Sequence, residues 1–327
     1  MKKIDIVKQY LDDFPNLPNL TLSKKIYNDY PAVFTSIDCI RTYIRELKGL
    51  LGEKHLKKRN NTKYFTKEKL QEKYNLPDAI EETYEPYYIK GDRGLIFSDI
   101  HIPFHDKDAL SIMFDYTSNI KFDFILIDGD LLDCYSLSNF DKIPDITRFP
   151  EDIEKTKQFF DILKKIYPNS RIYFKKGNHE KWFEQYLKRK APELWGINEF
   201  RLDIILDCYN KKINNIEESI YIDISGLSII HGHEYHKAVS SPANPARTLF
   251  LRTKATALCG HYHQTSEHTE PTINDKMITC WSIGCMCRLH PEWMPLNKWN
   301  HGFAIYERFD NNFWTIQNKR ILLGKVV

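Results

Sequence analysis

The sequence predicts an α/β protein with a small all-α module at its N-terminus. Residues 1–48 contain three short segments with apolar residues at helical spacing, whereas from Gly94 onward short apolar runs alternate with amphipathic segments. Polar residues directly follow several of these apolar runs, and the carboxyl ends of strands are where α/β sheets hold their sites. We therefore expect a helical module over residues 1–60, a basic and charged linker over 61–92, and a larger domain over 93–327.

The N-terminal module is expected to contain three helices. The first ends at Pro15, and the second covers residues 22–30. The third begins after Thr35 and Ser36, because either hydroxyl can cap free N–H groups of a helix. Its apolar face holds Ile37, Ile40, Ile44 and Leu47. Three short helices with a basic third one are typical of a helix-turn-helix module.

Basic residues on the third helix and just after it could neutralise nucleic-acid phosphates. The candidates are Arg41, Arg45, Lys48, Lys57, Lys58 and Arg59. The positive excess of the chain lies in this part, since residues 1–90 have 17 Lys and Arg against 13 Asp and Glu. Two other interpretations give the same pattern: a three-helix cap that packs on a neighbouring domain, and a solvated linker.

The larger domain is expected to alternate strands and helices. The predicted strands are 95–97, 124–127, 171–174, 227–230 and 257–259, and the predicted crossover helices are 108–116 and 152–166. Residues 276–284 and 302–316 are expected to form several more strands, with a hairpin turn at Asp310-Asn311-Asn312.

The composition excludes several classes of protein. No apolar run approaches the ~20 residues that cross a bilayer, and we expect no membrane association. Seven scattered cysteines, an odd number, predict reduced thiols and a cytoplasmic location. Cys285 and Cys287 are too close for the Cys-x-x-Cys spacing of zinc sites and are expected to be apolar strand residues.

The polar residues that follow the strands are suited to binding metal ions. They are Asp99, His101, Asp130, Asn178, His231, His261 and His263. Oxygen and imidazole donors favour Mn, Fe or Zn over a thiolate-bound metal. Seven ligands are too many for one ion. Two ions ~3.5–4 Å apart, bridged by one carboxylate, would use all of them and would activate a bridging water for attack on phosphorus.

These residues stand in blocks whose order resembles the calcineurin-like metallophosphoesterase superfamily. The blocks are Asp99-x-His101, Gly129-Asp130-x-x-Asp133, Gly177-Asn178-His179-Glu180, His231 and Gly260-His261-x-His263. The resemblance covers residues ~94–265 and implies a two-sheet αββα sandwich flanked by helices. An N-terminal helical module ahead of such a core is similar to uncharacterised bacterial and phage proteins.

The resemblance also implies a role for each residue. One ion would be held by Asp99, His101 and His263, and the other by Asn178, His231 and His261, with Asp130 bridging them. His179 would be the general acid, and Asp133 would hydrogen-bond the other nitrogen of its ring. Mn is the expected metal, with Fe, Zn, Ni or Mg as alternatives.

Other residues near these blocks have less certain roles. His231 is preferred over His233 as a ligand because it directly follows a strand, and His233, His105 and Arg288 are candidates for substrate contact. The tryptophans near Arg288 offer stacking faces to bases, or alternatively hold the C-terminal strands to the core. Glu180 is expected to complement the positive end of a helix.

The leading functional hypothesis is a dimetal phosphodiesterase that hydrolyses a phosphate ester in DNA or RNA. One alternative is a phosphomonoesterase acting on proteins or small metabolites, and another is a nucleic-acid-binding protein with an inactive metal core. Protein phosphatases of the superfamily normally follow the second block with Arg-Gly, whereas here Asp133 is followed by Cys134-Tyr135. The complete ligand set argues against an inactive core. The sequence sets no oligomeric state.

Overall fold

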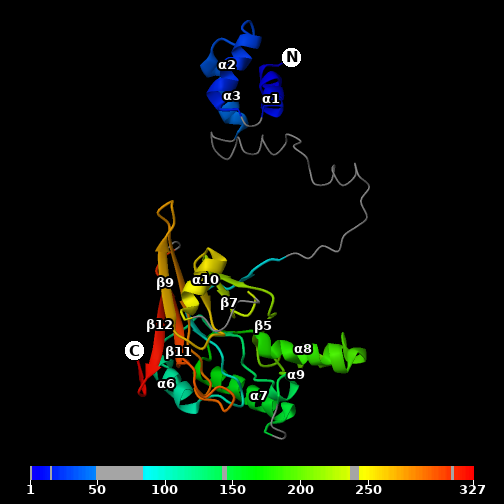
Figure 1. The fold of residues 1–327 in the computed structure, drawn as a ribbon, viewed down its shortest axis with the longest axis vertical. Helices are drawn as coiled ribbons and strands as arrows, with labels where there is room; N and C mark the ends of the chain where they lie inside the picture. Colours follow the sequence, from blue (N-terminus) through cyan, green and yellow to red (C-terminus); the bar gives the residue numbers. More distant parts are fainter. Residues whose placement is uncertain (1, 15–16, 49–83, 142–145, 236–242, 311–312) are drawn as a thin grey trace. The chain divides into compact units, whose positions relative to one another are not determined.

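The computed structural model describes residues 2–14, 17–48, 84–141, 146–235, 243–310 and 313–327. The chain divides into two compact units, Met1–Glu82 and Thr83–Val327 (Figure 1). The second unit begins before residue 93, and its first strand lies within the range predicted as linker. Lys57, Lys58 and Arg59 lie outside the described residues.

The N-terminal unit contains the three predicted helices, α1 (Lys3–Asp13), α2 (Asn19–Asp29) and α3 (Ile37–Leu47). The Ser36 side chain accepts a hydrogen bond from the backbone N–H of Cys39 at 3.2 Å, so the predicted cap of α3 is confirmed. The apolar faces of the three helices form one buried cluster. Its members are Ile6, Val7, Leu22, Ile26, Phe34, Ile40, Ile44 and Leu47.

The basic face of α3 is only partly as predicted. Arg41 and Arg45 are exposed, and Arg41 pairs with Asp38 at 3.1 Å. Lys48 is half-buried, because its Nζ donates a hydrogen bond to Oδ1 of Asn19 at 2.6 Å. The exposed cations of α3 are therefore the two arginines.

The second unit contains two sheets. The seven-stranded sheet has the order β13-β12-β11-β2-β3-β4-β5, and the six-stranded sheet has the order β1-β6-β7-β8-β10-β9. The strands of the first are β2 (Arg93–Phe97), β3 (Phe124–Asp128), β4 (Arg171–Lys175), β5 (Ile213–Ile216), β11 (Gly302–Arg308), β12 (Trp314–Leu322) and β13 (Lys325–Val326). Those of the second are β1 (Tyr87–Tyr88), β6 (Ile222–Ile224), β7 (Leu227–Ile230), β8 (Ala257–Cys259), β9 (Ser266–Pro271) and β10 (Met277–Ser282). Strands β2 to β5 are parallel, as are β7, β8 and β10.

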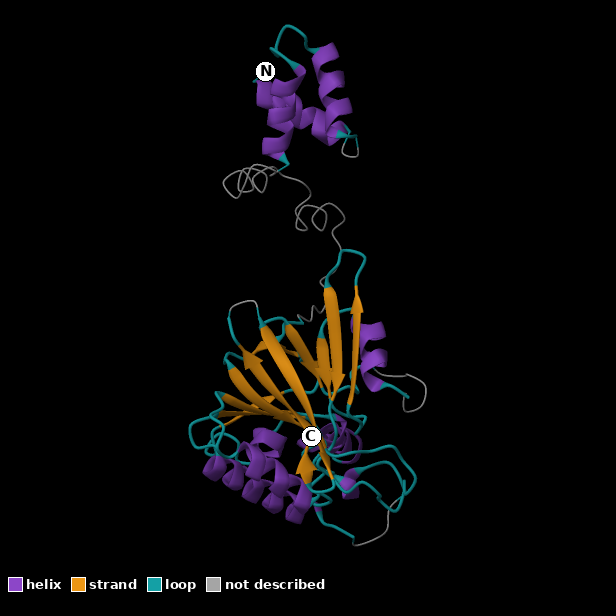
Figure 2. Ribbon diagram, turned by 90° about the vertical axis from the view of Figure 1, so that its left-hand side faces the viewer, coloured by secondary structure: helices purple, strands orange, loops and turns teal. Residues whose placement is uncertain are grey.

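Helices cover the outer faces of both sheets. The α-helices are α6 (Lys107–Thr117), α7 (Phe149–Ile166), α8 (Asn178–Lys190), α9 (Leu202–Ile205) and α10 (Pro245–Thr253), and the short 3₁₀ turns are η1 (Tyr135–Leu137), η2 (Pro192–Leu194) and η3 (Asn198–Phe200). Residues of α6, α7 and α8 pack in one core with β2, β3 and β4, and α10 packs against β8 and β10. Figure 2 shows the strands lying between these helices. The predicted αββα sandwich is confirmed.

Successive side chains of the central strands point alternately into two different cores. Leu95 and Phe97 face the helices, whereas Ile96 faces the second sheet. Because both faces are buried, β2 and β3 are continuous apolar runs, which is why the sequence revealed them.

One feature differs from expectation, and another lies partly outside the described residues. Cys285 and Cys287 are buried, as expected, but they lie in a loop after β10 that makes isolated bridges to Ser98 and His105. The predicted turn at Asp310 joins β11 to β12, but Asn311 and Asn312 are outside the described residues. Within the described part of the chain, no helix is long and apolar enough to cross a bilayer.

Candidate metal centre

The predicted ligands come together where the carboxyl ends of strands from both sheets meet. Asp99 and His101 follow β2, and Asp130 follows β3. Asn178 is the first residue of α8, directly after β4. The six-stranded sheet contributes His231 after β7, and His261 and His263 after β8. Sequence positions more than 160 residues apart thus supply one cluster.

Three of the expected ligand atoms lie close to one another, one each from Asp99, His101 and His263. Nε2 of His263 lies 3.1 Å from Oδ1 of Asp99 and 3.3 Å from Nε2 of His101. Nε2 of His101 lies 3.9 Å from Oδ1 of Asp99. Two ligand atoms at right angles on one ion are about 3 Å apart when each bond is about 2.1 Å. These three side chains therefore have the spacing to share an ion.

Asp130, His231 and His261 form a second group, in which one ligand atom of each lies within 4.8 Å of the others. Oδ2 of Asp130 is 3.1 Å from Nε2 of His231 and 3.9 Å from Nε2 of His101. This oxygen therefore lies between the two groups, in the place that a bridging carboxylate needs. Its partner Oδ1 accepts a hydrogen bond from the backbone N–H of His179 at 3.0 Å.

Three of the expected ligand atoms are buried and form no hydrogen bond within the described residues. They are Oδ1 of Asp99, Oδ1 of Asn178 and Nε2 of His231. Leaving a buried polar atom unpaired costs about 1–3 kcal/mol, so such atoms are rare in folded proteins. Two bound divalent ions would satisfy all three, one through Asp99 and the other through Asn178 and His231, so the residues present fit a two-metal site.

Strained backbone marks the same residues. Five of the seven expected ligands have positive φ: Asp99 (55°), His101 (51°), Asp130 (51°), His261 (66°) and His263 (56°). Residues other than glycine avoid this region because Cβ crowds the backbone. Strain of this kind persists where it positions functional side chains.

Two motif glycines allow close approach to the ligands. A Cβ at Gly177 would lie 2.2 Å from Oδ1 of Asp130. A Cβ at Gly260 would lie 2.3 Å from Oγ of Ser98 and 2.8 Å from Oδ2 of Asp99. Any side chain at either position would push a ligand aside.

Hydrogen bonds fix which nitrogen of two histidines faces the centre. Nδ1 of His231 donates to the carbonyl of Asp128 at 2.6 Å, and Nδ1 of His101 donates to Oδ2 of Asp133 at 3.0 Å. In both rings Nε2 is then free to bind metal. The backbone carbonyl of Asp128 thus orients the ring of His231.

The hydrogen bond expected between Asp133 and the other nitrogen of His179 is present, but the backbone carbonyl of Asp133 makes it and the carboxylate does not. Nδ1 of His179 donates to the backbone carbonyl of Asp133 at 2.7 Å, while the nearest carboxylate oxygen is 3.7 Å away. The carboxylate is bonded to His101, because the loop after β3 turns the side chain toward the β2 loop and the carbonyl toward α8. Asp133 therefore orients both rings through different atoms.

His179 lies at the edge of the cluster. Its side chain is 16% exposed, against 0% for His231, and its Nε2 is 3.8 Å from Oδ2 of Asp130. It is close enough to share an ion with His101 and Asp130, since one atom of each lies within 4.8 Å of the others. Its distance from Asp130 is similar to that of the expected ligand His101, so only the greater exposure of His179 favours a role toward substrate.

Neighbouring charges shift the pKa values of the expected ligands. Burial lowers the pKa of His263, but the charges of Asp99 and Cys285 and hydrogen bonds to both together outweigh burial and raise the pKa to about 10. Burial raises the pKa of Asp130, but His231 and His179 outweigh it and hold that pKa well below its usual value. Anionic carboxylates amid imidazoles are what a dication site requires.

Glu180 has a role that its sequence position did not reveal. It is completely buried, and its carboxylate accepts hydrogen bonds from the backbone N–H groups of Gly177 (2.7 Å), Asp130 (3.1 Å) and Leu132 (2.9 Å). The expected contribution to the start of α8 is present, and the bonds to Asp130 and Leu132 also fix the loop that carries the bridging carboxylate. Only the fold brings that loop to α8.

The predicted substrate contacts His105, His233 and Arg288 lie in the loops that follow β2, β7 and β10. The ring of His233 lies near those of His231 and His261, with centroids 5.4 and 6.3 Å away. His105 is half-buried, and its backbone pairs with that of Cys287. Arg288 is exposed, and its backbone N–H donates to the carbonyl of Phe104 at 3.0 Å.

Cys287 is a neighbour of the centre that the sequence did not identify. Its Sγ lies 3.7 Å from Nδ1 of His263, on the side of the ring away from Asp99. This contact places the thiol behind a ligand. One ligand atom each of Cys287, His101 and His263 also lies within 4.8 Å of the others, so the spacing would allow this thiol to share an ion with the two histidines. That Cys287 is not a ligand therefore stays a prediction.

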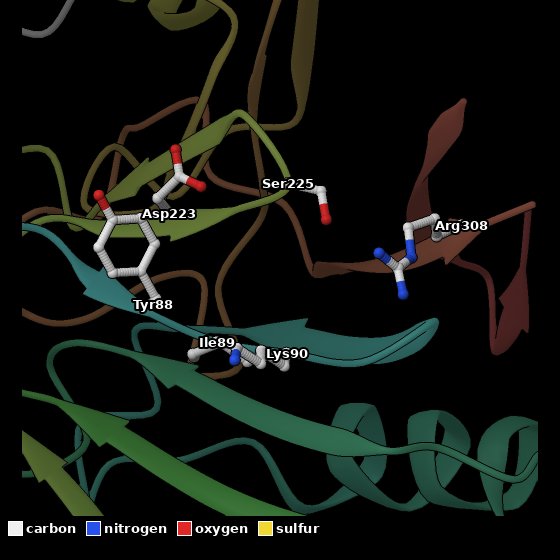
Figure 3. Close-up of a pocket in the computed structure, with 6 residues that line it drawn as sticks. All are labelled: Tyr88, Ile89, Lys90, Asp223, Ser225 and Arg308. Carbon is white, nitrogen blue, oxygen red and sulfur yellow. The ribbon is translucent and has the colours of Figure 1, made fainter. Parts of the chain in front are cut away.

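A pocket of about 360 Å³ lies elsewhere in the second unit (Figure 3). It is lined by Tyr88, Ile89, Lys90, Asp223, Ser225 and Arg308. The side chain of Arg308 is already paired with Asp92. None of the expected ligands lines this pocket, so it is separate from the metal centre.

Comparison with known proteins gives relatives from phages. The chain is 27% identical to the Gene 54 protein of Mycobacterium phage L5 over 225 residues, which is 65% of this chain and 88% of that protein. It is 26% identical to the Gene 54 protein of Mycobacterium phage D29 over 178 residues, 53% of this chain and 69% of the relative.

Solved structures with a related arrangement include Vps29 proteins. A Vps29 mutant from Entamoeba histolytica is 14% identical to this chain, with a TM-score of 0.38. The match covers 72% of this chain and 96% of the mutant. Vacuolar protein sorting 29 from Cryptosporidium parvum is 15% identical, with a TM-score of 0.41 and coverage of 72% and 95%.

Residues 93–276 match the sequence profile of the calcineurin-like phosphoesterases. The match begins at β2 and contains every block of the metal centre described above. This range is more than half of the 327 residues. The chain therefore belongs to the calcineurin-like phosphoesterase family, whose members hydrolyse phosphate esters with the help of metal ions.

Proposed function

We propose that this protein is a two-metal phosphodiesterase that cleaves phosphodiester bonds in nucleic acid in the cytoplasm. Asp99, His101 and His263 would hold one ion, Asn178, His231 and His261 would hold the other, and Asp130 would be shared between them. The observation that carries this proposal is the set of buried, unpaired ligand atoms at the meeting of the two sheets. The cysteines are all unpaired, which fits a reducing compartment.

Two divalent ions, with Mn²⁺ expected from the mixed nitrogen and oxygen donors, would supply Lewis-acid activation of water and neutralise charge on phosphorus. The protein's own residues set the geometry. Asp133 and the Asp128 carbonyl hold the rings of His101 and His231, and Glu180 holds the loop of Asp130.

His179 delivers the proton to the leaving oxygen. With Nδ1–H donated to the carbonyl of Asp133, the proton that moves is the one on Nε2, at the partly exposed edge of the cluster. Burial lowers the pKa of this histidine, and the negative charge of Asp130 opposes that effect. A protonated imidazole near its pKa is an efficient general acid.

Two features support a diester in nucleic acid over a monoester. At the position where the protein phosphatases have an arginine that binds the phosphate group, this chain has the buried Cys134, which cannot make the same contact. The N-terminal unit has a helix with exposed Arg41 and Arg45, and residues 1–90 carry the positive excess of the chain.

The test is hydrolysis by the full-length protein with Mn²⁺. The substrates are single- and double-stranded DNA and RNA, bis(p-nitrophenyl) phosphate, p-nitrophenyl phosphate and a phosphopeptide. We expect cleavage of nucleic acid and of the diester, with loss of both in the Asp130→Asn variant. Faster release of phosphate from the phosphopeptide would support a phosphatase. DNA binding with no hydrolysis in any divalent metal would support an inactive core.

A further inference from the structure

Aromatic side chains extend outward from two sides of the metal centre. On one side Trp182 lies against His179, with ring centroids 3.9 Å apart, and Phe140 lies 5.7 Å from Trp182. On the other side Trp299 lies against His263, with centroids 4.1 Å apart, and Trp293 lies 5.5 Å from Trp299. Each row thus runs from a residue of the centre to an outer ring.

The outer rings are not part of a core. Phe140 is 71% exposed and Trp293 is 67% exposed, whereas Trp182 and Trp299 are half-buried. Large exposed aromatic rings beside a reactive centre instead offer faces to a ligand.

The loop that carries Trp293 and Trp299 is anchored to the ligands themselves. Asn300 donates a backbone hydrogen bond to the carbonyl of His263 at 2.9 Å, and Met286 donates one to that of Asp99 at 3.0 Å. Within the loop, the side chain of Asn297 donates to the carbonyls of Leu289 and Met294 at 2.6 and 2.8 Å. A loop tied in this way presents its rings with little loss of entropy on binding.

Three cations lie near His105, which follows the loop that carries the ligands Asp99 and His101. Lys107, Lys155 and Arg288 are all close enough to His105 to lower its pKa, after the larger effect of burial. A polyanion with aromatic groups on both sides of a phosphate would meet cations and aromatic faces together.

We propose that Phe140 and Trp293 stack unpaired bases on the two sides of the scissile phosphate, so that the substrate is single-stranded nucleic acid. This inference rests on the proposed phosphodiesterase function and names its substrate class. In a duplex, each base face is covered by its neighbours and is closed to a protein ring. In a single strand the faces are open, and stacking on aromatic side chains is tolerant of sequence.

The test compares two esters with the same leaving group. Thymidine 5′-(p-nitrophenyl phosphate) carries a base, and methyl p-nitrophenyl phosphate does not, so the ratio of their kcat/KM values isolates base binding. We expect a ratio of about 10 or more in the wild type, because one stacked base is worth roughly a tenfold gain. Substituting Phe140→Ala and Trp293→Ala together should return this ratio to near 1. The same ratio measured for Phe140→Ala and for Trp293→Ala separately shows which of the two rings binds the base.

Matched controls separate stacking from a general disturbance. Leu296→Ala removes a side chain that is 94% exposed on the same loop, and Phe309→Ala removes an exposed phenylalanine on another hairpin. Both should keep the wild-type ratio, and Trp293→Phe should retain most of it because an aromatic face remains. An unchanged ratio in the double variant, or an equal fall in Leu296→Ala, would overturn the proposal.

Oligonucleotides distinguish this inference from the proposed function. The wild type should cleave a single strand at least tenfold faster than the same sequence in a duplex, and the double variant should lose that preference. Equal cleavage of both forms, with no effect of the aromatic variants, would overturn the inference alone. Cleavage of neither form, with hydrolysis of bis(p-nitrophenyl) phosphate intact, would overturn the nucleic-acid function on which it rests.

Discussion

Replacing His179 with alanine should slow the hydrolysis of esters with poor leaving groups far more than that of activated esters. The proposed proton on Nε2 matters when the leaving oxygen has a high pKa, as in a nucleoside alkoxide. A nitrophenolate leaves almost as well without a proton. His179→Ala should therefore produce a defect that depends on the leaving group and not on the metal concentration.

The size of this defect follows from the contacts of the side chain. Among the described residues, the side chain of His179 makes one hydrogen bond, from Nδ1 to the carbonyl of Asp133, and its Nε2 is 3.8 Å from Asp130, so its removal should leave the metal ligands in place. General-acid catalysis contributes roughly 10²–10⁴ in rate, or about 3–5 kcal/mol in the barrier. We expect this loss on a dinucleotide and a loss below about tenfold on bis(p-nitrophenyl) phosphate.

Asp133→Asn should give the opposite pattern. Its backbone carbonyl remains to orient His179, whereas its side chain loses the charge that faces Nδ1 of His101. Substituting the partner of a metal-bound histidine typically costs about 10–100-fold in metal affinity. The defect should be similar on both esters and should diminish as Mn²⁺ is raised.

The assay measures kcat/KM on both esters across a Mn²⁺ titration, together with bound metal by elemental analysis. His268→Ala is the matched control, because this histidine lies on β9 and contacts Glu270 and Phe250. Loss of a metal ion from His179→Ala would show that His179 is a ligand. Equal losses on both esters would refute its role as the acid.

Three further substitutions test the construction of the centre. Asp130→Asn should abolish activity and lower metal content from about two ions toward one, and full occupancy with normal turnover would contradict a bridging role. Glu180→Ala should lower the free energy of unfolding of the metal-free protein by at least about 3 kcal/mol, since it leaves three backbone N–H groups unpaired. Urea denaturation measures this free energy. A change below about 1 kcal/mol would contradict a stabilising role of the three hydrogen bonds to Glu180. Gly177→Ala should remove metal binding through its clash with Asp130, which calorimetric titration with Mn²⁺ would detect; wild-type affinity would contradict this reasoning.

Local pattern alone determined much of this protein. The strands β2, β3 and β4 are apolar runs because both of their faces are buried, and the helix α3 has its cap and its apolar face within a dozen residues. The ligands could be named because each directly follows such a strand. Both a short motif and the strand before it can be identified from the local sequence, without knowledge of contacts to distant residues.

Strands with a polar, half-exposed pattern were not predicted. β9 has the sequence SEHTEP, and it is a strand because it pairs with β10 along one edge of the sheet. Its residues carry no apolar alternation that would indicate this. Pairing with a neighbour, which is a property of the fold, decided its structure.

The partners of the ligands were decided by tertiary structure only. Which atom of Asp133 meets His179, and which loop Glu180 binds, depend on how the loops after β2 and β3 turn toward α8. Likewise Trp182 and Trp299 are 117 positions apart in the chain, yet each packs against a histidine of the same centre. Residue types specify the metal chemistry, whereas hydrogen-bond direction and ring contacts arise from the packing of segments that are distant in sequence.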